Sequence, residues 1–105
     1  MTNELTPHIK YYSNGNVWIK GQWNSKGQEE GIWEWFYENG NIRRRATFKE
    51  GKWDGIEEWF YPNGNIRSRI PYKEGKKDGI HEWFDEWRNI TTTTLWKDGE
   101  IIEEN

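Results

Sequence analysis

Three glutamates recur at a fixed spacing and are the first residues in this sequence that could do chemistry. Glu34, Glu58 and Glu82 lie 24 residues apart, each directly before a tryptophan. Two carboxylates that flank a sugar linkage can cleave it as a general acid and a base or nucleophile. In the sheet inferred below, neighbouring members of this set lie two strands apart, about 9.5 Å, with an arginine between them. That arrangement favours ionised, salt-bridged carboxylates, so we predict no catalytic residue.

Other residue types offer no metal, cofactor or nucleophilic chemistry. His8 and His81 are separated by most of the chain, and there is no cysteine. Neither a disulfide nor a thiolate metal site is therefore expected. The segments EGKW and EGKK lack the Ser or Thr of a phosphate-binding loop. We expect a protein with no metal site, no cofactor and no enzymatic activity.

A repeated unit explains the spacing of the glutamates. The segment FYENGNIRRRATFKEGKWDGIEEW (36–59) is followed by FYPNGNIRSRIPYKEGKKDGIHEW (60–83). Self-similarity at such a period is typical of stacked repeats. We predict one domain over residues 1–105. Its parts are a half unit at 7–12, repeats at about 13–37, 38–61 and 62–85, and an incomplete unit at 86–105.

Each unit is predicted to be a β-hairpin. The segments between glycines are short, alternate in character and are rich in aromatic and β-branched residues, which is typical of strands. Asn-Gly recurs three times and is the strongest short hairpin signal, whereas KEGKWDG and KEGKKDG predict a longer turn. No segment has helical spacing with caps. The predicted fold class is all-β, a single-layer antiparallel meander of about eight strands with no element left to cover a sheet face.

The turns predict which residues oppose each other. A two-residue loop at Asn39-Gly40 places Trp35 opposite Arg44, and a four-residue loop at 50–53 places Lys49 opposite Asp54. The two registers agree across the sheet. One face then carries a ladder of alternating charge: Lys20, Glu34, Arg45, Glu58, Arg69 and Glu82. The same face carries a second ladder: Tyr11, Trp18, Phe36, Arg43, Phe60, Arg67 and Phe84.

The opposite face is predicted to be mainly aromatic. Its central ladder is Ile19, Trp35, Arg44, Trp59, Ser68 and Trp83. Beside this ladder lie, on one side or the other, Tyr37, Ile42, Tyr61, Ile66, Trp33 and Ala46. Such a column is either the packing spine of the repeat or a platform that binds a partner.

Composition indicates a small folded domain. A hydrophobic content of 32% and a mean hydropathy of -1.22 lean towards disorder. Nine Trp, five Tyr and four Phe reverse that reading, because they recur periodically and bury large areas. The net charge of -3 leaves no basic footprint for nucleic acid. The sequence shows no secretion signal or apolar membrane span, so a cytoplasmic location is expected.

Consecutive arginines are the sharpest basic feature. Arg43, Arg44 and Arg45 cannot share a face of one strand, because successive side chains alternate. We interpret them mainly as cross-strand partners of glutamates and phenylalanines. A contact with a phosphate or lipid headgroup is the alternative, and its candidate residues are Arg43, Arg45, Arg67 and Arg69.

The motifs YENGNI, FKEGKWDGIEEW and YKEGKKDGIHEW resemble the MORN-repeat family (membrane occupation and recognition nexus), in its bacterial variant form, over roughly residues 9–100. The resemblance implies a curved sheet of stacked hairpins that serves as a binding or scaffolding module, not an enzyme. The resemblance also suggests an antitoxin that neutralises another protein, or a module that binds a phospholipid or a cytoskeletal partner. The last unit departs from the pattern, since DEWRN replaces YENGN and its turn lacks glycine.

Three functions stay open. An uncovered aromatic face favours a protein-binding module, such as an antitoxin, inhibitor or scaffold, and its partner would be another protein or a second copy of the chain. Phospholipid-headgroup or membrane-surface binding is disfavoured by the net acidity, and a carbohydrate-binding platform rests on tryptophan content alone. The predicted partner-binding residues are Trp33, Trp35, Tyr37, Arg44, Trp59, Tyr61 and Trp83.

Overall fold

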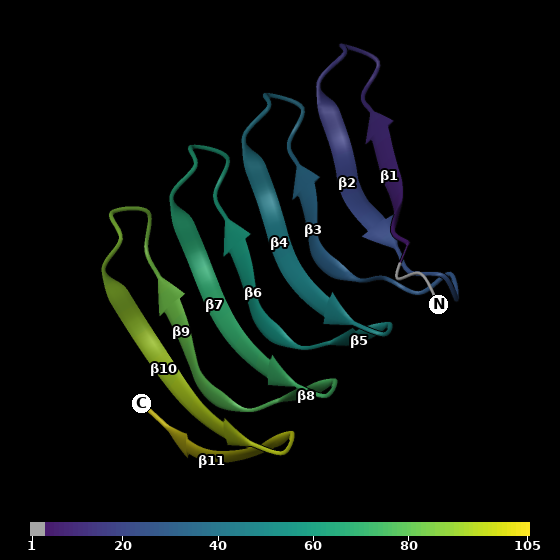
Figure 1. The fold of residues 1–105 in the computed structure, drawn as a ribbon. Coiled ribbons are helices and arrows are strands. Elements are labelled where there is room, and N and C mark those ends of the chain that lie inside the picture. The colour runs from purple at the N-terminus through teal and green to yellow at the C-terminus, as the bar shows by residue number, and fades with distance from the viewer. Residues whose placement is uncertain (1–3) are drawn as a thin grey trace.

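One antiparallel sheet contains every strand of the computed structural model, which describes residues 4–105. The first three residues of the predicted domain lie outside that range. Neighbouring strands follow the order β1-β2-β3-β4-β6-β7-β9-β10-β11. Figure 1 shows the hairpins stacked side by side, with the Asn-Gly turns along one edge of the sheet and the Glu-Gly turns along the other. The all-β fold class is confirmed, with no helix among the described residues.

Long strands alternate with shorter return strands. The strands of the main path are β1 (Thr6–Tyr11), β2 (Val17–Trp23), β3 (Gly31–Phe36), β4 (Ile42–Lys49), β6 (Gly55–Phe60), β7 (Ile66–Lys73), β9 (Gly79–Phe84), β10 (Ile90–Lys97) and β11 (Glu100–Glu104). Two short strands, β5 (Lys52–Trp53) and β8 (Lys76–Lys77), fold back on β4 and β7. Over residues 4–105 the sheet therefore has eleven strands against the expected eight. The additional strands are β5, β8 and β11, the last formed by the tail after the Asp98-Gly99 turn.

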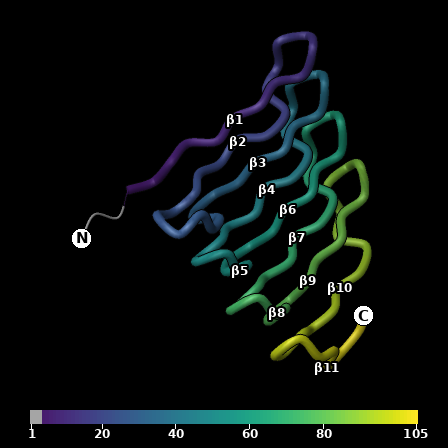
Figure 2. The backbone as a smooth tube through the Cα atoms, turned by 90° about the vertical axis from the view of Figure 1, so that its right-hand side faces the viewer, coloured from purple at the N-terminus to yellow at the C-terminus, as the bar shows by residue number. Residues whose placement is uncertain are grey.

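The sheet forms a single layer. Its principal extents are 43 × 37 × 14 Å, and the backbone trace of residues 4–105 shows no element packed on either face (Figure 2). Two stacked sheets would place backbones about 10 Å apart before outer side chains are added, so a thickness of 14 Å leaves room for one sheet. Each face is therefore covered only by its own side chains.

The core is small and lies on one face. Its buried members are Trp33, Ala46 and Phe48, packed against Ile19, Trp23, Trp35 and Trp53. The indole of Trp33 lies directly over Gly21, where an added Cβ would come within 2.1 Å of the ring. Its Nε1 donates a hydrogen bond to the carbonyl of Gln22 at 3.2 Å. Glycine at position 21 thus makes the room that the largest side chain of the core needs.

The Asn-Gly turns are longer than the predicted two-residue loop. The N–H of Tyr37 donates to the carbonyl of Asn41 at 2.8 Å, and the N–H of Gly40 donates to the carbonyl of Tyr37 at 3.0 Å. The loop therefore has three residues and ends on Gly40 with φ of +93°. This is the common three-residue hairpin loop, a type I turn followed by a left-handed residue.

A β-bulge at Arg43 then restores the predicted register. The extra loop residue shifts the pairing by one, and the bulge shifts it back, so that Trp35 opposes Arg44 as predicted. The predicted ladder that pairs phenylalanines with Arg43 and Arg67 is wrong, as is the pairing of Tyr11 with Trp18. The observed pairs are Tyr11 with Val17, Phe36 with Ile42, and Phe60 with Ile66.

The Glu-Gly turns are tighter than predicted. Lys49 opposes Lys52 and not Asp54, so the loop consists of Glu50 and Gly51, with φ of 50° and 82°. Positive φ at both positions is the requirement of a type I′ turn. The chain then bends before β6, and this bend returns the pairing to the predicted register.

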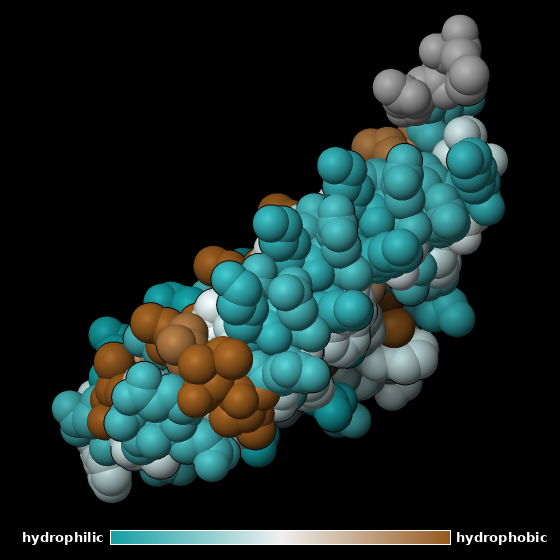
Figure 3. All heavy atoms as spheres, turned by 90° about the horizontal axis from the view of Figure 1, so that it is seen from below, coloured by the Kyte–Doolittle hydropathy of each residue, from teal (hydrophilic) through white to brown (hydrophobic). Residues whose placement is uncertain are grey.

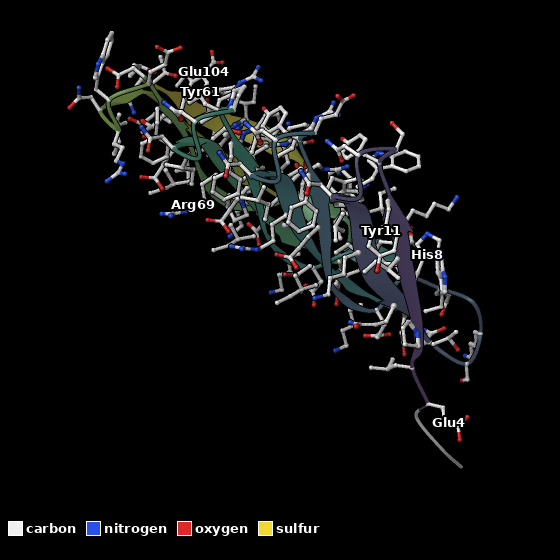
Figure 4. The ribbon with its side chains drawn as sticks, turned by 90° about the horizontal axis from the view of Figure 1, so that it is seen from above. Glu4, His8, Tyr11, Tyr61, Arg69 and Glu104 are labelled. Atoms are coloured by element: carbon white, nitrogen blue, oxygen red, sulfur yellow. The ribbon has the colours of Figure 1, made fainter. Side chains whose placement is uncertain are left out.

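Both central ladders run across the sheet as predicted. The charged pairs are Lys20–Glu34, Glu34–Arg45, Arg45–Glu58, Glu58–Arg69 and Arg69–Glu82. The pairs on the other side are Ile19–Trp35, Trp35–Arg44, Arg44–Trp59, Trp59–Ser68 and Ser68–Trp83. We name these sides the charged face and the aromatic face after these two ladders. Figure 4 shows His8 and Arg69 on opposite sides of the sheet.

The last hairpin closes without glycine. Arg88 takes the left-handed position with φ of 71°, which costs an L-residue about 1–2 kcal/mol. The carboxylate of Asp85 compensates, because it accepts the N–H of Trp87 at 2.8 Å and that of Asn89 at 2.9 Å. These bonds hold the pKa of the Asp85 carboxyl below its usual value, chiefly through Asn89. DEWRN therefore makes the same turn with different residues.

Exposed isoleucines also mark the surface. Seen from below, the molecule is a narrow, mainly hydrophilic band with its largest hydrophobic patch at one end and smaller, separate hydrophobic groups along its length (Figure 3). The charged face carries Ile32, Ile56 and Ile80, which are 53%, 47% and 57% exposed. Single exposed aliphatic residues of this kind are normal on protein surfaces, and we assign them no role.

Candidate functional site

The aromatic face holds most of the residues that the sequence predicted to bind a partner. Trp35, Trp59 and Trp83 form a row in which neighbours stand two strands apart, with Arg44 and Ser68 on the strands between. Trp83, at the C-terminal end of the row, is the most exposed of the three, at 37%. Two of the three tryptophans are half-buried, so the row is in part a packing spine.

Arg44 is packed between tryptophans. Its guanidinium carbon lies 4.4 Å from the ring centre of Trp35, and 5.0 Å from those of Trp53 and Trp59. Its Nε donates to a carboxylate oxygen of Glu57 at 2.7 Å. The side chains of Arg44 and Glu57 are 19% and 4% exposed. Cation–π contacts strengthen when water is excluded, so these contacts hold Arg44 within the face.

Glu57 extends this network to Tyr72. Burial, and next the negative charge of Glu57, raise the pKa of Tyr72 to about 12. The Tyr72 ring stacks on Trp53 with centroids 4.5 Å apart and an interplanar angle of 12°. Glu57 was not predicted from the sequence. A signal was present, because Glu57 is a charged residue at the repeat position that Trp33 and His81 occupy in the flanking repeats.

The predicted tyrosines have a different environment from the tryptophans. The hydroxyl of Tyr37 donates to the backbone carbonyl of Phe60 at 2.6 Å, and that of Tyr61 donates to the carbonyl of Phe84 at 2.8 Å. Each bond joins one repeat to the next. Asparagines of the turns add parallel bonds from Asn16, Asn41 and Asn65 to the carbonyls of Glu38, Pro62 and Glu86. The recurring YxNGN motif is the sequence signal for these links.

Trp33 lies deeper than the other predicted binding residues. It is 4% exposed, its ring centre is 4.7 Å from that of Trp23, and its ring makes a T-shaped contact with that of Phe48. In this structure Trp33 is part of the core. The accessible part of the predicted set is therefore centred on Trp59 and Trp83.

The arginines proposed for anion contact fall into two groups. Arg45 lies 3.3 Å from Glu34 and 3.5 Å from Glu58, and Arg69 has the same arrangement with Glu58 and Glu82 at 3.6 and 3.8 Å. Their charges are therefore compensated. Arg43 and Arg67 are the bulged residues, are exposed, and make no ion pair with any residue of 4–105.

Histidines and carboxylates do not converge on this face. Within residues 4–105, no group of three or more His, Cys, Asp or Glu side chains is placed to hold a metal ion. His8 packs against Trp23 and Trp33 with ring centres 5.3 and 5.6 Å apart. His81 is 5% exposed and lies 4.6 Å from the ring of Trp83. Residues 4–105 form no helix, and so no helix of that part of the chain could cross a membrane.

An open sheet of stacked hairpins places the protein in the class of β-repeat modules. Residues 29–50 and 53–74 each match the family profile described as a MORN repeat variant. The first segment holds β3 and β4, and the second begins at the last residue of β5 and holds β6 and β7. No curated protein and no solved structure matches the chain. The chain thus carries MORN repeat variants at residues 29–74, as the resemblance predicted, and such repeats generally bind or scaffold other molecules and are typically non-catalytic.

Proposed function

We propose that the protein is a cytoplasmic, non-enzymatic binding module that neutralises another protein, as an antitoxin or inhibitor does, through its aromatic face. The observation that carries this proposal is the absence, within residues 4–105, of any element covering the face that bears Trp59 and Trp83. A sheet with an apolar face is normally packed against a second layer. A partner surface would supply that layer.

The dimensions and residue types of the face support a protein partner. A stable interface buries about 800 Å² on each side, and a sheet 43 by 37 Å across offers more than that. Tryptophan, tyrosine and arginine dominate binding hot spots, at about 2 kcal/mol or more on truncation. The aromatic face displays these side chains, whereas the charged face pairs its arginines with glutamates.

Capture of a partner from the native host, followed by mass spectrometry, tests the proposal. We expect Trp59→Ala to weaken binding to the captured protein by at least about tenfold. Trp83→Ala should act in the same direction with less effect on folding, since Trp83 is more exposed. Trp87→Ala is the matched control, because Trp87 is 77% exposed and lies in the turn between β9 and β10, not on a strand of the aromatic row. Unchanged binding by folded Trp59→Ala and Trp83→Ala would refute the proposal.

Headgroup binding is the second candidate, favoured by the exposed, unpaired Arg43 and Arg67. Flotation with anionic liposomes tests it. We expect weak flotation, because carboxylates compensate Arg45 and Arg69 on the charged face. Strong flotation that high salt and Arg43→Glu both abolish would favour the membrane over a protein partner.

A further inference from the structure

The space between two tryptophans that the Arg44 side chain fills is left empty at the equivalent position of the next repeat. The equivalent residue, 24 positions on, is Ser68, which lies between Trp59 and Trp83 as Arg44 lies between Trp35 and Trp59. Ser68 is 2% exposed and its side chain is short. A cavity of about 160 Å³ lies at this place, lined by Trp59, Arg67, Ser68, Ile70 and Trp83.

We propose that this slot is a socket for one aromatic ring, the side chain of a phenylalanine or tyrosine on the partner protein. The inference rests on the proposed function and specifies the chemistry that the aromatic face recognises. An apolar cavity of roughly 150 Å³ holds one benzene molecule. A slot of about 160 Å³ therefore has the size for a single six-membered ring.

The Arg44 site shows that one flat group fits between neighbouring tryptophans of the row. Its guanidinium carbon lies 4.4 and 5.0 Å from the two indole centres. Trp59 and Trp83 stand the same two strands apart. Aromatic pairs prefer centroid separations of 4.5–7 Å, so a ring between Trp59 and Trp83 can contact both.

Charges around the slot disfavour a partner's arginine. At the Arg44 site, Glu57 neutralises the cation and Trp53 adds a third ring. The positions 24 residues on are His81 and Lys77. Burial, and next the charge of Lys77, hold the pKa of His81 below its usual value, so His81 is neutral near pH 7. Among the residues that the structure describes, no Asp or Glu lines the slot.

Arg67 reaches this slot because of the bulge. The pairing shifts between Trp59 and Phe60, so Arg67 is the extra residue of its strand, and bulges re-aim side chains in this way. Arg67 therefore lines the slot together with Ser68. Its guanidinium would repel a second guanidinium but attracts the π face of an inserted ring.

Titration of the isotope-labelled protein with N-acetyl-tyrosine amide, followed by NMR of the tryptophan indole N–H groups, tests the socket without the partner. We expect saturable shifts of the Trp59 and Trp83 signals, and no such shifts with N-acetyl-arginine amide. Ser68→Arg fills the slot from within and should weaken tyrosine-amide binding by at least about tenfold. Trp83→Leu removes one wall, should act likewise, and keeps the test valid if Ser68→Arg does not fold.

Thr93→Arg is the matched control. It adds the same charge on the charged face opposite Glu82, and should leave tyrosine-amide binding unchanged. No saturable shift with the tyrosine amide, or tighter binding of the arginine amide, would overturn the socket whatever the partner capture shows. Binding of the amide by the wild type together with full partner binding by Trp83→Leu would overturn its role in recognition, while leaving the rest of the aromatic face as the proposed interface.

Discussion

Arg44 and Glu57 form an ion pair on the aromatic face, with side chains 19% and 4% exposed. Removing one member of a buried pair leaves an uncompensated charge and costs about 3–5 kcal/mol, whereas replacing both costs much less. We therefore expect Arg44→Leu and Glu57→Leu each to lower the free energy of unfolding strongly, and the double variant to lose less than the sum. Urea unfolding of the three variants measures the coupling. Additive losses would show that the pair does not act as a unit.

On the charged face, Arg45 should matter more than Lys20. Arg45 contacts both Glu34 and Glu58 at 3.3 and 3.5 Å, whereas Lys20 opposes Glu34 alone in this ladder. Exposed pairs contribute up to about 1 kcal/mol each, so Arg45→Ala should cost more than Lys20→Ala by a small amount that salt reduces. Equal urea midpoints at low salt would count against the ladder.

The hydroxyl of Tyr37 should stabilise the stacking of repeats. Tyr37→Phe removes the bond to the carbonyl of Phe60 and keeps the ring, so we expect a loss of about 1 kcal/mol in the free energy of unfolding. Tyr11 is 58% exposed, and Tyr11→Phe serves as the control with little change expected. Equal stability of the two variants in urea would show that the Tyr37 hydroxyl does not stabilise the contact between repeats.

Arg88→Gly should stabilise the protein. The left-handed φ of 71° at Arg88 costs about 1–2 kcal/mol that glycine does not incur. The hydrogen bonds from the Arg88 side chain to Asn65, at 3.0 and 3.1 Å, are exposed. Their loss in the variant should therefore offset only part of the stabilisation. Thermal unfolding should show a higher midpoint for Arg88→Gly and a lower one for Gly40→Ala, where φ is +93°. A lower midpoint for Arg88→Gly would mean that its side-chain contacts outweigh the backbone strain.

Stability should fall as the pH drops below about 6.5, the usual pKa of histidine. Burial and Lys77 lower the pKa of His81 in the folded state, so the unfolded chain takes up a proton first and gains stability relative to the fold. The loss continues until the pH passes the lowered folded pKa. His81→Phe should show a smaller fall in urea midpoint between pH 7.5 and pH 5. An unchanged fall would assign the effect to other groups.

The sequence alone determined the hairpin repeat, the two faces and the central register. Arg45 was predicted between Glu34 and Glu58 and lies there, because a strand alternates strictly and a 24-residue period carries each alternation into the next unit. These properties are local, so a residue's type and position in the unit place it on a face wherever the strand is regular. The bulged Arg67 is the exception, because it was predicted on the charged face and lines the slot on the aromatic face.

Only the tertiary structure decided the turns, the bulges and the depth of each side chain. The three-residue loop that ends at Gly40 and the bulge at Arg43 shift the pairing in opposite directions, so the inner register could be predicted while both features were missed. Likewise Trp33 lies in the core and Trp83 at the surface although both were placed on one face. The difference follows from neighbouring repeats: Gly21 makes room for one indole, and Ser68 leaves a gap beside the other. Such contacts join residues distant in the chain, and their outcome depends on the volumes that adjacent strands bring together, which the pattern within one unit does not contain.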